Sequence, residues 1–240
     1  MLDELITSNL ILFSIIAIPI FYSIASFIIR YKEYKNSGYF KSTQNSYWQV
    51  FGDAGKKGEY FLYQWLQPFE CLNYKFLFNL YIPRENNKTS EIDMVIIHPK
   101  GLLVVESKNY SGWIFGNENN KQWTQVLPAG KGRSHKEYFY NPIMQNAAHI
   151  RAIRKYINDT IPIYSIIAFS DDCTLKDVTV KNNKVIVDYY SCIYKEIKNR
   201  LAEITDYSMS SELMEETYNV LMQYANVDEI IKKQHIYNID

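Results

Sequence analysis

The chain has 240 residues, 47% hydrophobic and 22% charged, and this composition is typical of a folded protein and excludes a disordered one. Basic and acidic residues balance at 26 each, so bulk charge gives no support for tight electrostatic binding of nucleic acid, although a local basic patch is compatible with it. Three distant cysteines without CxxC spacing argue against a disulfide framework or a zinc knuckle and favour buried, reduced thiols.

The first predicted element is a membrane-spanning helix. No charged residue occurs from Leu5 to Ile29, and residues 10–29, "LILFSIIAIPIFYSIASFII", are numerous enough for a helix to cross the hydrocarbon core of a bilayer. Pro19 lies mid-span, where membrane helices tolerate proline. A cleaved signal peptide is the alternative, but the chain begins with the acidic "MLDE" and no A-x-A-like cleavage site follows.

The charges beside the apolar segment predict its orientation. Basic residues follow the segment and acidic residues precede it: Arg30, Lys32 and Lys35 against Asp3 and Glu4. By the positive-inside rule, residues 30–240 then lie in the cytoplasm. We therefore expect residues 1–30 to be a single-pass anchor. Residues 31–50, polar and aromatic without a clear period, are expected to be a juxtamembrane linker.

Helical and strand-like segments alternate after the linker. The sequence predicts, in order, a helix entered through "GDAGKKGEYFLYQWL", a strand at Tyr74–Ile82, a loop at Pro83–Ser90, strands at Glu91–His98 and Gly101–Asn109, short strands and loops at 110–140, a helix in "NPIMQNAAHIRAIRKYIND", and strands at Ile161–Ser170 and in "KVIVDYY". Asn141 and Pro142 are typical of the cap and first position of the second helix. This order predicts an α/β protein, a three-layer α/β/α sandwich around a mixed central sheet.

The last fifty residues, 191–240, are expected to form a C-terminal helical extension. Two helices are predicted, around residues 191–204 and 209–225, and a polar tail follows them.

The hairpin "EIDMVIIHPKGLLVVESKNY" carries charges inside its predicted strands. A turn at His98–Gly101 sets an antiparallel register that places Asp93 directly opposite Glu106 and Glu91 directly opposite Lys108. Directly opposed residues share a face of the sheet, so the two acids are expected to lie side by side. A slip of one residue would separate them, so the register is itself a prediction.

Two opposed carboxylates are destabilising, and burial makes each resist ionisation. A bound Mg²⁺ or Mn²⁺ removes this objection, because Mg²⁺ favours one or two protein carboxylates and keeps waters or phosphate oxygens. Lys108, two residues after Glu106, could hold a phosphate oxygen, or orient or deprotonate the attacking water. The arrangement suits phosphodiester hydrolysis. The alternative is an edge strand charged against aggregation, but the apolar residues on both strands favour a buried central pair.

These residues resemble the NERD (nuclease-related) domain, a branch of the PD-(D/E)XK restriction-endonuclease-like group. The similarity lies in "GKKGEYFLYQWL", "EIDMVIIHPKGLLVVESKNYSGWIFG", "QW" and "YNPIMQNAAHI", in that order. It assigns residues 51–190 to a nuclease-like domain and implies a restriction-endonuclease-like form of the sandwich.

The resemblance also implies roles for individual residues. Asp93 matches the motif aspartate, and Glu106 and Lys108 match the E-x-K pair. Glu59 matches a helical glutamate that joins Asp93 and Glu106 around the metal, and Gln145 matches a glutamine that supports the site. Without the resemblance, Glu59 would be explained by an acid in the first turn of a helix, where the helix dipole favours it.

Other polar and aromatic residues have simpler interpretations. Trp113 and Trp123 are expected in the core instead of serving as platforms for bases. His98 and His149 are not expected to be metal ligands, because no second His or Cys has ligand spacing to either. Seven basic residues could form a phosphate-binding rim, but scattered surface charge explains them as well: Lys56, Lys57, Arg133, His135, Lys136, Arg151 and Arg154.

The sequence leaves competing functions open. The first is a membrane-anchored, Mg²⁺-dependent nuclease-like protein with its catalytic domain in the cytoplasm and nucleic acid, DNA before RNA, as its partner. The alternative is a non-catalytic, membrane-tethered module that binds nucleic acid or protein through the same fold, since fold alone does not fix function. A membrane-bound scaffold without a metal site is the third.

Overall fold

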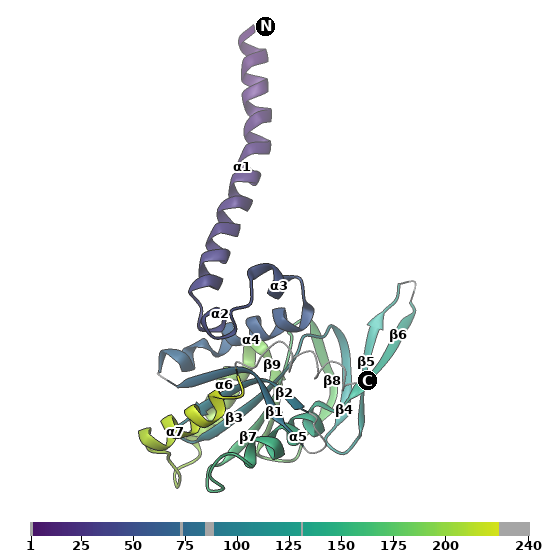
Figure 1. Ribbon diagram of the computed structural model, residues 1–240. Coiled ribbons are helices and arrows are strands. Elements are labelled where there is room, and N and C mark those ends of the chain that lie inside the picture. Colours follow the sequence, from purple (N-terminus) through teal and green to yellow (C-terminus); the bar gives the residue numbers. More distant parts are fainter. Residues whose placement is uncertain (1, 73, 85–88, 131, 226–240) are drawn as a thin grey trace. The chain divides into compact units, whose positions relative to one another are not determined.

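The structure, a computed structural model, describes residues 2–72, 74–84, 89–130 and 132–225 (Figure 1). The chain forms two compact units, residues 1–47 and 48–240. Part of the loop expected before the charged hairpin, residues 85–88, and the polar tail from residue 226 lie outside the described residues.

The first unit holds a long helix, α1 (Leu2–Asn36), and a short one, α2 (Gly38–Thr43). Within the described part of the chain, Ile15–Asn36 is long and apolar enough to cross a membrane. The helix continues past residue 30, because residues 30–36 contain no glycine or proline. Ser37 follows it, and its hydroxyl caps α2 by accepting a hydrogen bond from the Phe40 amide at 3.1 Å. With α3 (Tyr47–Phe51), most of the expected linker is therefore helical.

The second unit is built on a five-stranded sheet with the order β1-β2-β3-β7-β9. The strands β1, β2 and β3 are antiparallel neighbours, whereas β3, β7 and β9 run parallel, so the sheet is mixed as predicted. The strands are β1 (Lys75–Pro83), β2 (Thr89–His98), β3 (Gly101–Lys108), β7 (Ile163–Phe169) and β9 (Val185–Tyr189). Their near-continuous hydrophobic runs are typical of strands covered on both faces.

Helices cover this sheet on both faces, which confirms the predicted α/β sandwich. On one face, α5 (Pro142–Arg154) and α7 (Ser211–Met222) pack on β1, β2 and β3 in one hydrophobic cluster. On the other face, α4 (Ala54–Cys71) and α6 (Tyr190–Ala202) pack together, with Phe69 and Tyr194 ring centroids 4.7 Å apart. The helices α6 and α7 confirm the two expected near the C-terminus.

A second, four-stranded sheet has the order β6-β5-β4-β8 and was not predicted as a separate sheet. Its strands are β4 (Gly112–Asn117), β5 (Gln122–Pro128), β6 (Ser134–Tyr140) and β8 (Cys173–Thr179). It packs on the first sheet through Trp123, which stacks on Phe169 with ring centroids 6.0 Å apart. Cys173 is buried as expected, in the hydrophobic cluster that Trp123 and Phe169 form between the two sheets. The free thiols of Cys71 and Cys192 are exposed, contrary to the prediction.

Candidate functional site

The β2–β3 hairpin has the register that the sequence predicts. The two strands pair from His98–Gly101 to Met94–Val105, where their backbone pairing ends. Gly101 closes the turn with φ of 131°, and a Cβ at this position would lie 2.4 Å from the Pro162 carbonyl oxygen. Only glycine fits this turn, and the turn fixes which residues of β2 and β3 face each other.

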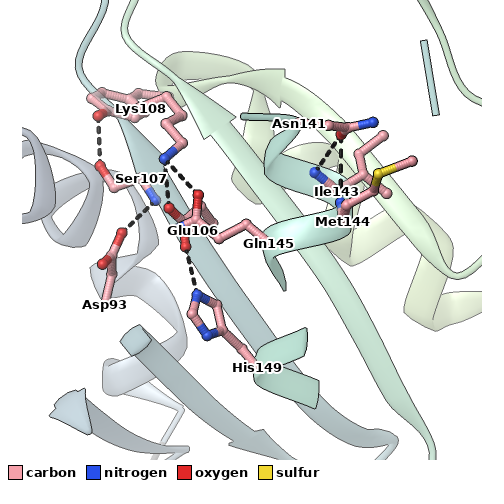
Figure 2. A network of polar contacts seen from close by, with 10 residues as sticks. Asp93, Glu106, Ser107, Lys108, Asn141, Ile143, Met144, Gln145 and His149 are labelled. Carbon is pink, nitrogen blue, oxygen red and sulfur yellow. Dashed lines mark hydrogen bonds and ion pairs between the residues drawn. The ribbon is translucent and has the colours of Figure 1, made fainter. Parts of the chain in front are cut away.

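Asp93 and Glu106 lie one step beyond the last backbone pair, where β2 and β3 separate. The Asp93 carboxylate enters this opening and accepts a hydrogen bond from the Ser107 backbone N–H at 2.8 Å (Figure 2). The side chain of Asp93 is thus held against β3 although the backbone pairing has ended.

Glu91 lies outside this cluster, so the expected pair between Glu91 and Lys108 is wrong. The physical reason is that β2 has already left β3 at this position. Glu91 pairs with Tyr81 of β1, and the Tyr81 hydroxyl donates to Glu91 Oε1 at 2.5 Å.

Lys108 joins two other predicted residues. Its ammonium donates to Glu106 Oε1 at 2.6 Å and to Gln145 Oε1 at 3.1 Å (Figure 2). Gln145 is presented by the first turns of α5, which begins at Pro142 and is capped by the Asn141 side chain as predicted. Glu106 is 2% exposed, so this ion pair lies in the interior of the protein, where it interacts strongly.

His149 belongs to the same cluster, although sequence reasoning missed it. It follows Gln145 by four residues on α5, and its Nε2 lies 3.3 Å from Glu106 Oε2. Its Nδ1 lies 2.7 Å from the Ser90 hydroxyl oxygen. If the Ser90 hydroxyl donates to Nδ1, the Nε2–H faces Glu106. The spacing of four residues from Gln145, which puts both side chains on one helix face, was the available signal.

Glu59 approaches from the opposite face of the sheet, on α4. The helix begins at Ala54, because Asp53 caps it by accepting the Lys56 amide at 2.9 Å. Glu59 therefore lies in the second turn of α4, whereas the sequence analysis expected it in the first turn. The helix dipole, which acts within the first turn, does not account for an acid here.

Gly58 sets the distance between α4 and the end of β3. A Cβ at Gly58 would lie 2.6 Å from Asn109 Cβ and 2.9 Å from the Tyr190 hydroxyl. The Asn109 side chain in turn donates to the Ala54 carbonyl at 2.7 Å. The glycine therefore allows the helix that carries Glu59 to approach the strand that carries Glu106 and Lys108.

The pKa values of the two central carboxyl groups, Asp93 and Glu106, are shifted in opposite directions. Burial, and then the charges of Glu106 and Glu59, raise the pKa of Asp93 well above its ordinary value. Burial also acts to raise the pKa of Glu106, but Lys108 and His149 outweigh it, and the pKa of Glu106 is lowered. Burial acts to lower the pKa of Lys108, but the charge of Glu106 outweighs it, so this pKa is raised and Lys108 stays protonated.

The donor set suits a divalent cation. Among the residues that the structure describes, no three His, Cys, Asp or Glu side chains form a ready-made metal cluster. Mg²⁺ nevertheless needs only one or two carboxylates, since waters and phosphate oxygens complete its shell. The buried Glu106 Oε2 has a long contact of 3.3 Å with His149 Nε2 but no hydrogen bond in the described part of the chain, and the charge of Asp93 is poorly compensated. Both features favour a cation between Asp93 and Glu106.

The remaining sequence candidates divide between structure and surface. Trp123 is fully buried as expected, and its indole N–H donates to the Asn117 carbonyl at 3.0 Å. Trp113 is 50% exposed, contrary to the expectation, because its neighbour Ile114 takes the inward position on β4. Arg154 donates to carbonyl groups just after α5, including that of Ile161 at 2.8 Å, and so acts as a structural residue.

Comparisons with known proteins agree with these motifs. Residues 54–170 match the family model described as NERD, nuclease-related domain, and this range includes all five predicted site residues. The chain is 34% identical over 182 residues to an uncharacterized protein of Bacillus anthracis. The aligned region covers 76% of this chain and 82% of the relative. No solved structure matches the chain.

Proposed function

The chain belongs to the NERD, nuclease-related domain, family, and we propose that it is a divalent-metal-dependent nuclease held at a membrane by its N-terminal helix. The observation that carries the proposal is the buried contact of Lys108 with Glu106 and Gln145, beside the carboxyl group of Asp93, whose charge is poorly compensated. Such a cluster costs stability unless a ligand completes it, and a metal ion with a phosphodiester would do so.

In this proposal Asp93 and Glu106 hold Mg²⁺ or Mn²⁺, and Glu59 assists from α4. The ion would make a bound water more acidic and offset the negative charge that develops on the phosphate. Hydrolysis then adds this water across one P–O bond of a nucleic acid, with DNA as the first substrate to test.

Lys108 acts by charge in this site. Since Glu106 raises the pKa of Lys108, its ammonium is suited to hold a phosphate oxygen or orient the water, and not to take a proton from it. Gln145 accepts from this ammonium and positions it. His149, backed by Ser90, positions the carboxylate of Glu106 from the other side.

The helix α1 supplies the proposed anchor. Its apolar segment is long enough to cross a bilayer. The basic residues that follow this segment favour a cytoplasmic second unit, so substrates would be met at the inner surface of the membrane: Arg30, Lys32 and Lys35.

One observation favours the alternative of a non-catalytic binding module. The carboxylate of Glu106 already faces Lys108 on one oxygen and His149 on the other, an arrangement that could persist without metal. Under this alternative the charged cluster is structural, and nucleic acid or protein would bind without divalent cations.

Cleavage assays separate the two functions. The full chain in detergent micelles is incubated with Mg²⁺ or Mn²⁺ and labelled single-stranded, double-stranded or branched DNA, or RNA. We expect cleavage of at least one substrate that EDTA abolishes and that Lys108→Ala abolishes, while Lys198→Ala, an exposed lysine on α6, retains it. No cleavage under any condition, or equal cleavage by Lys108→Ala, would contradict the proposal.

A further inference from the structure

The four-stranded sheet has an outer face that the proposed nuclease site does not use. Successive residues of a strand point to opposite faces, and Ile114, Trp123 and Phe139 point inward into the cluster between the two sheets. Their neighbours on β4, β5 and β6 therefore point outward. Figure 1 shows β5 and β6 extending as a hairpin beyond the rest of the sheet.

Exposed aromatic side chains gather on this outer face. Tyr138 and Tyr140 alternate with Phe139 along β6 and are 66% and 48% exposed. Trp113 on β4, next to the inward Ile114, is 50% exposed. Single exposed aromatic residues are common, but three on one face of one sheet form a surface on which flat rings can stack.

Strand pairing brings the aromatic residues next to an open groove of about 650 Å³. Tyr138 pairs with Thr124, and Thr124 pairs with Phe115; both partners line the groove. The other outward residues of the lining carry amide, hydroxyl or carboxylate groups: Asn117, Gln122, Asp177 and Thr179. The amides and hydroxyls both donate and accept hydrogen bonds and the carboxylate accepts them, as the edges of unpaired bases require.

The charge of this surface suits phosphate. Lys136 pairs with Val126, which pairs with Trp113, so Lys136 and Trp113 share one outward row. The ammonium of Lys176 lies 5.4 Å from the ring centroid of Trp113, and Lys181 lines the groove.

Two acidic residues, Glu118 and Asp177, also line the groove, and the carboxylate of Glu118 already accepts hydrogen bonds from the backbone. Glu118 Oε2 accepts from the backbone N–H groups of Lys181 and Asn182 at 3.1 and 3.2 Å. Asp177 remains as an acid exposed at the groove. On β6, Glu137 points to the opposite side, where it meets His135 at 3.4 Å. The outward rows therefore present lysines beside the exposed rings.

We propose that this outer face, defined by Trp113, Tyr138, Tyr140, Lys136 and the groove, binds unpaired nucleotides of a single-stranded nucleic acid. Bases stack on the exposed rings, Lys136 meets the phosphates, and the amides and hydroxyls of the groove meet the base edges. Paired bases cannot stack in this way, so a duplex binds more weakly.

The position of the face relative to the candidate site supports this assignment, which rests on the proposed function for the identity of the polymer. Phe139, on the inner side of β6, contacts Tyr110 with ring centroids 4.8 Å apart, and Tyr110 follows Lys108 by two residues. Tyr140 directly precedes Asn141, which caps the helix that carries Gln145. The strand β6 therefore contributes its outer side to the proposed surface, while its inner side and its end contact the segments that carry Lys108 and Gln145.

Binding is measured by fluorescence anisotropy with the full chain in detergent micelles and a labelled oligothymidylate of about 12 nucleotides. EDTA is present, so no cleavage interferes. We expect the double variant Tyr138→Ala/Tyr140→Ala to bind at least about tenfold more weakly, since each stacked base contributes substantially. We expect Lys136→Ala to reduce the slope of the logarithm of the affinity against the logarithm of the salt concentration by about one. The matched control His135→Ala, on the opposite side of the same strand, keeps wild-type affinity.

The outcomes separate this inference from the proposed nuclease activity. Binding that persists in Lys198→Ala, an exposed lysine on α6, but is lost in the tyrosine double variant, supports the inference even if no substrate is cleaved, provided that the double variant keeps the wild-type melting temperature. Wild-type affinity in the double variant overturns it, even if the chain is a nuclease. Binding of a neutral oligosaccharide such as maltohexaose, without binding of oligothymidylate, would also overturn it and assign the face to carbohydrate.

Discussion

The two sheets of the second unit place their polar groups in opposite ways. The five-stranded sheet is covered by helices on both faces, and Glu106 is buried within it beside the partly buried Asp93 and Lys108. The four-stranded sheet packs on the rest of the protein with one face only, and on its other face polar and aromatic side chains are exposed to solvent. Interior charges are costly and solvated ones are not, which is why we propose a reaction centre in the first sheet and a binding surface on the second.

The largest effect is expected from removing one partner of the buried ion pair. Lys108→Ala leaves Glu106 buried without its cation, so the free energy of unfolding falls by about 3–5 kcal/mol, and cleavage falls by about 100-fold or more. Chemical denaturation and cleavage assays measure the two effects.

A double variant separates stability from function at this pair. In Glu106→Gln/Lys108→Met neither charge remains, so we expect most of the stability to return while cleavage stays absent. Cleavage by the double variant would show that the pair is structural only.

Matched truncations in the two sheets test the difference in burial. Leu103→Ala in β3 removes a fully buried side chain, and we expect a loss of about 2–5 kcal/mol in the free energy of unfolding. Tyr138→Ala in β6 removes a side chain that is 66% exposed, and we expect a change within about 0.5 kcal/mol. If urea denaturation shows equal losses of unfolding free energy for the two variants, the Tyr138 side chain is buried and not exposed on the outer face.

The next effect concerns His149, which touches Glu106 but not the proposed ion. We expect His149→Gln to weaken Mg²⁺ affinity by about 10- to 100-fold, as is usual when a partner of a metal ligand is replaced. Isothermal titration calorimetry measures this affinity. The control is His98→Gln, a buried histidine in the hairpin turn, which should leave the affinity unchanged even if it lowers stability. Equal affinities in both variants would exclude a positioning role for His149.

The smallest effect is a gain in stability from Asp93→Asn without metal. The folded pKa of Asp93 is raised above its ordinary value of 3.8 by burial, Glu106 and Glu59. The folded state therefore binds the proton more tightly, and stability falls as pH rises through this window. The variant escapes this loss, so its melting temperature should exceed that of the wild type at neutral pH in EDTA, by about 2–4 °C per kcal/mol. The difference should close as the pH falls towards 3.8; a variant less stable than the wild type at neutral pH would contradict the account.

The hairpin register could be predicted from the sequence, because the two-residue period of strands and a glycine turn leave little freedom. The register placed Asp93 beside Glu106, and the structure adds that the strands part at that point. The helical position of Glu59 was mispredicted because the Asp53 cap in "GDAGKKGE" was overlooked, although its residue type is a recognised start signal.

The second sheet could not be predicted as a separate unit, because its strands depend on contacts distant in sequence. β8, "CTLKDVT", has little apolar alternation of its own, and it becomes a strand by pairing in parallel with β4. His149 was dismissed as an isolated histidine, since no ligand spacing surrounds it. Its partners Ser90 and Glu106 come from two different strands, and only the fold brings them together.

The central claim, that Asp93 and Glu106 form a metal site, is tested most directly by a Mg²⁺ titration of the melting temperature of the full chain. A ligand that binds only the folded state stabilises it by about 2.7 kcal/mol at one hundred times its dissociation constant. The account predicts that the melting temperature of the wild type rises with Mg²⁺ concentration and that of Asp93→Asn does not. Unchanged melting temperatures for both chains at millimolar Mg²⁺ and Mn²⁺, or equal increases for both, would contradict it.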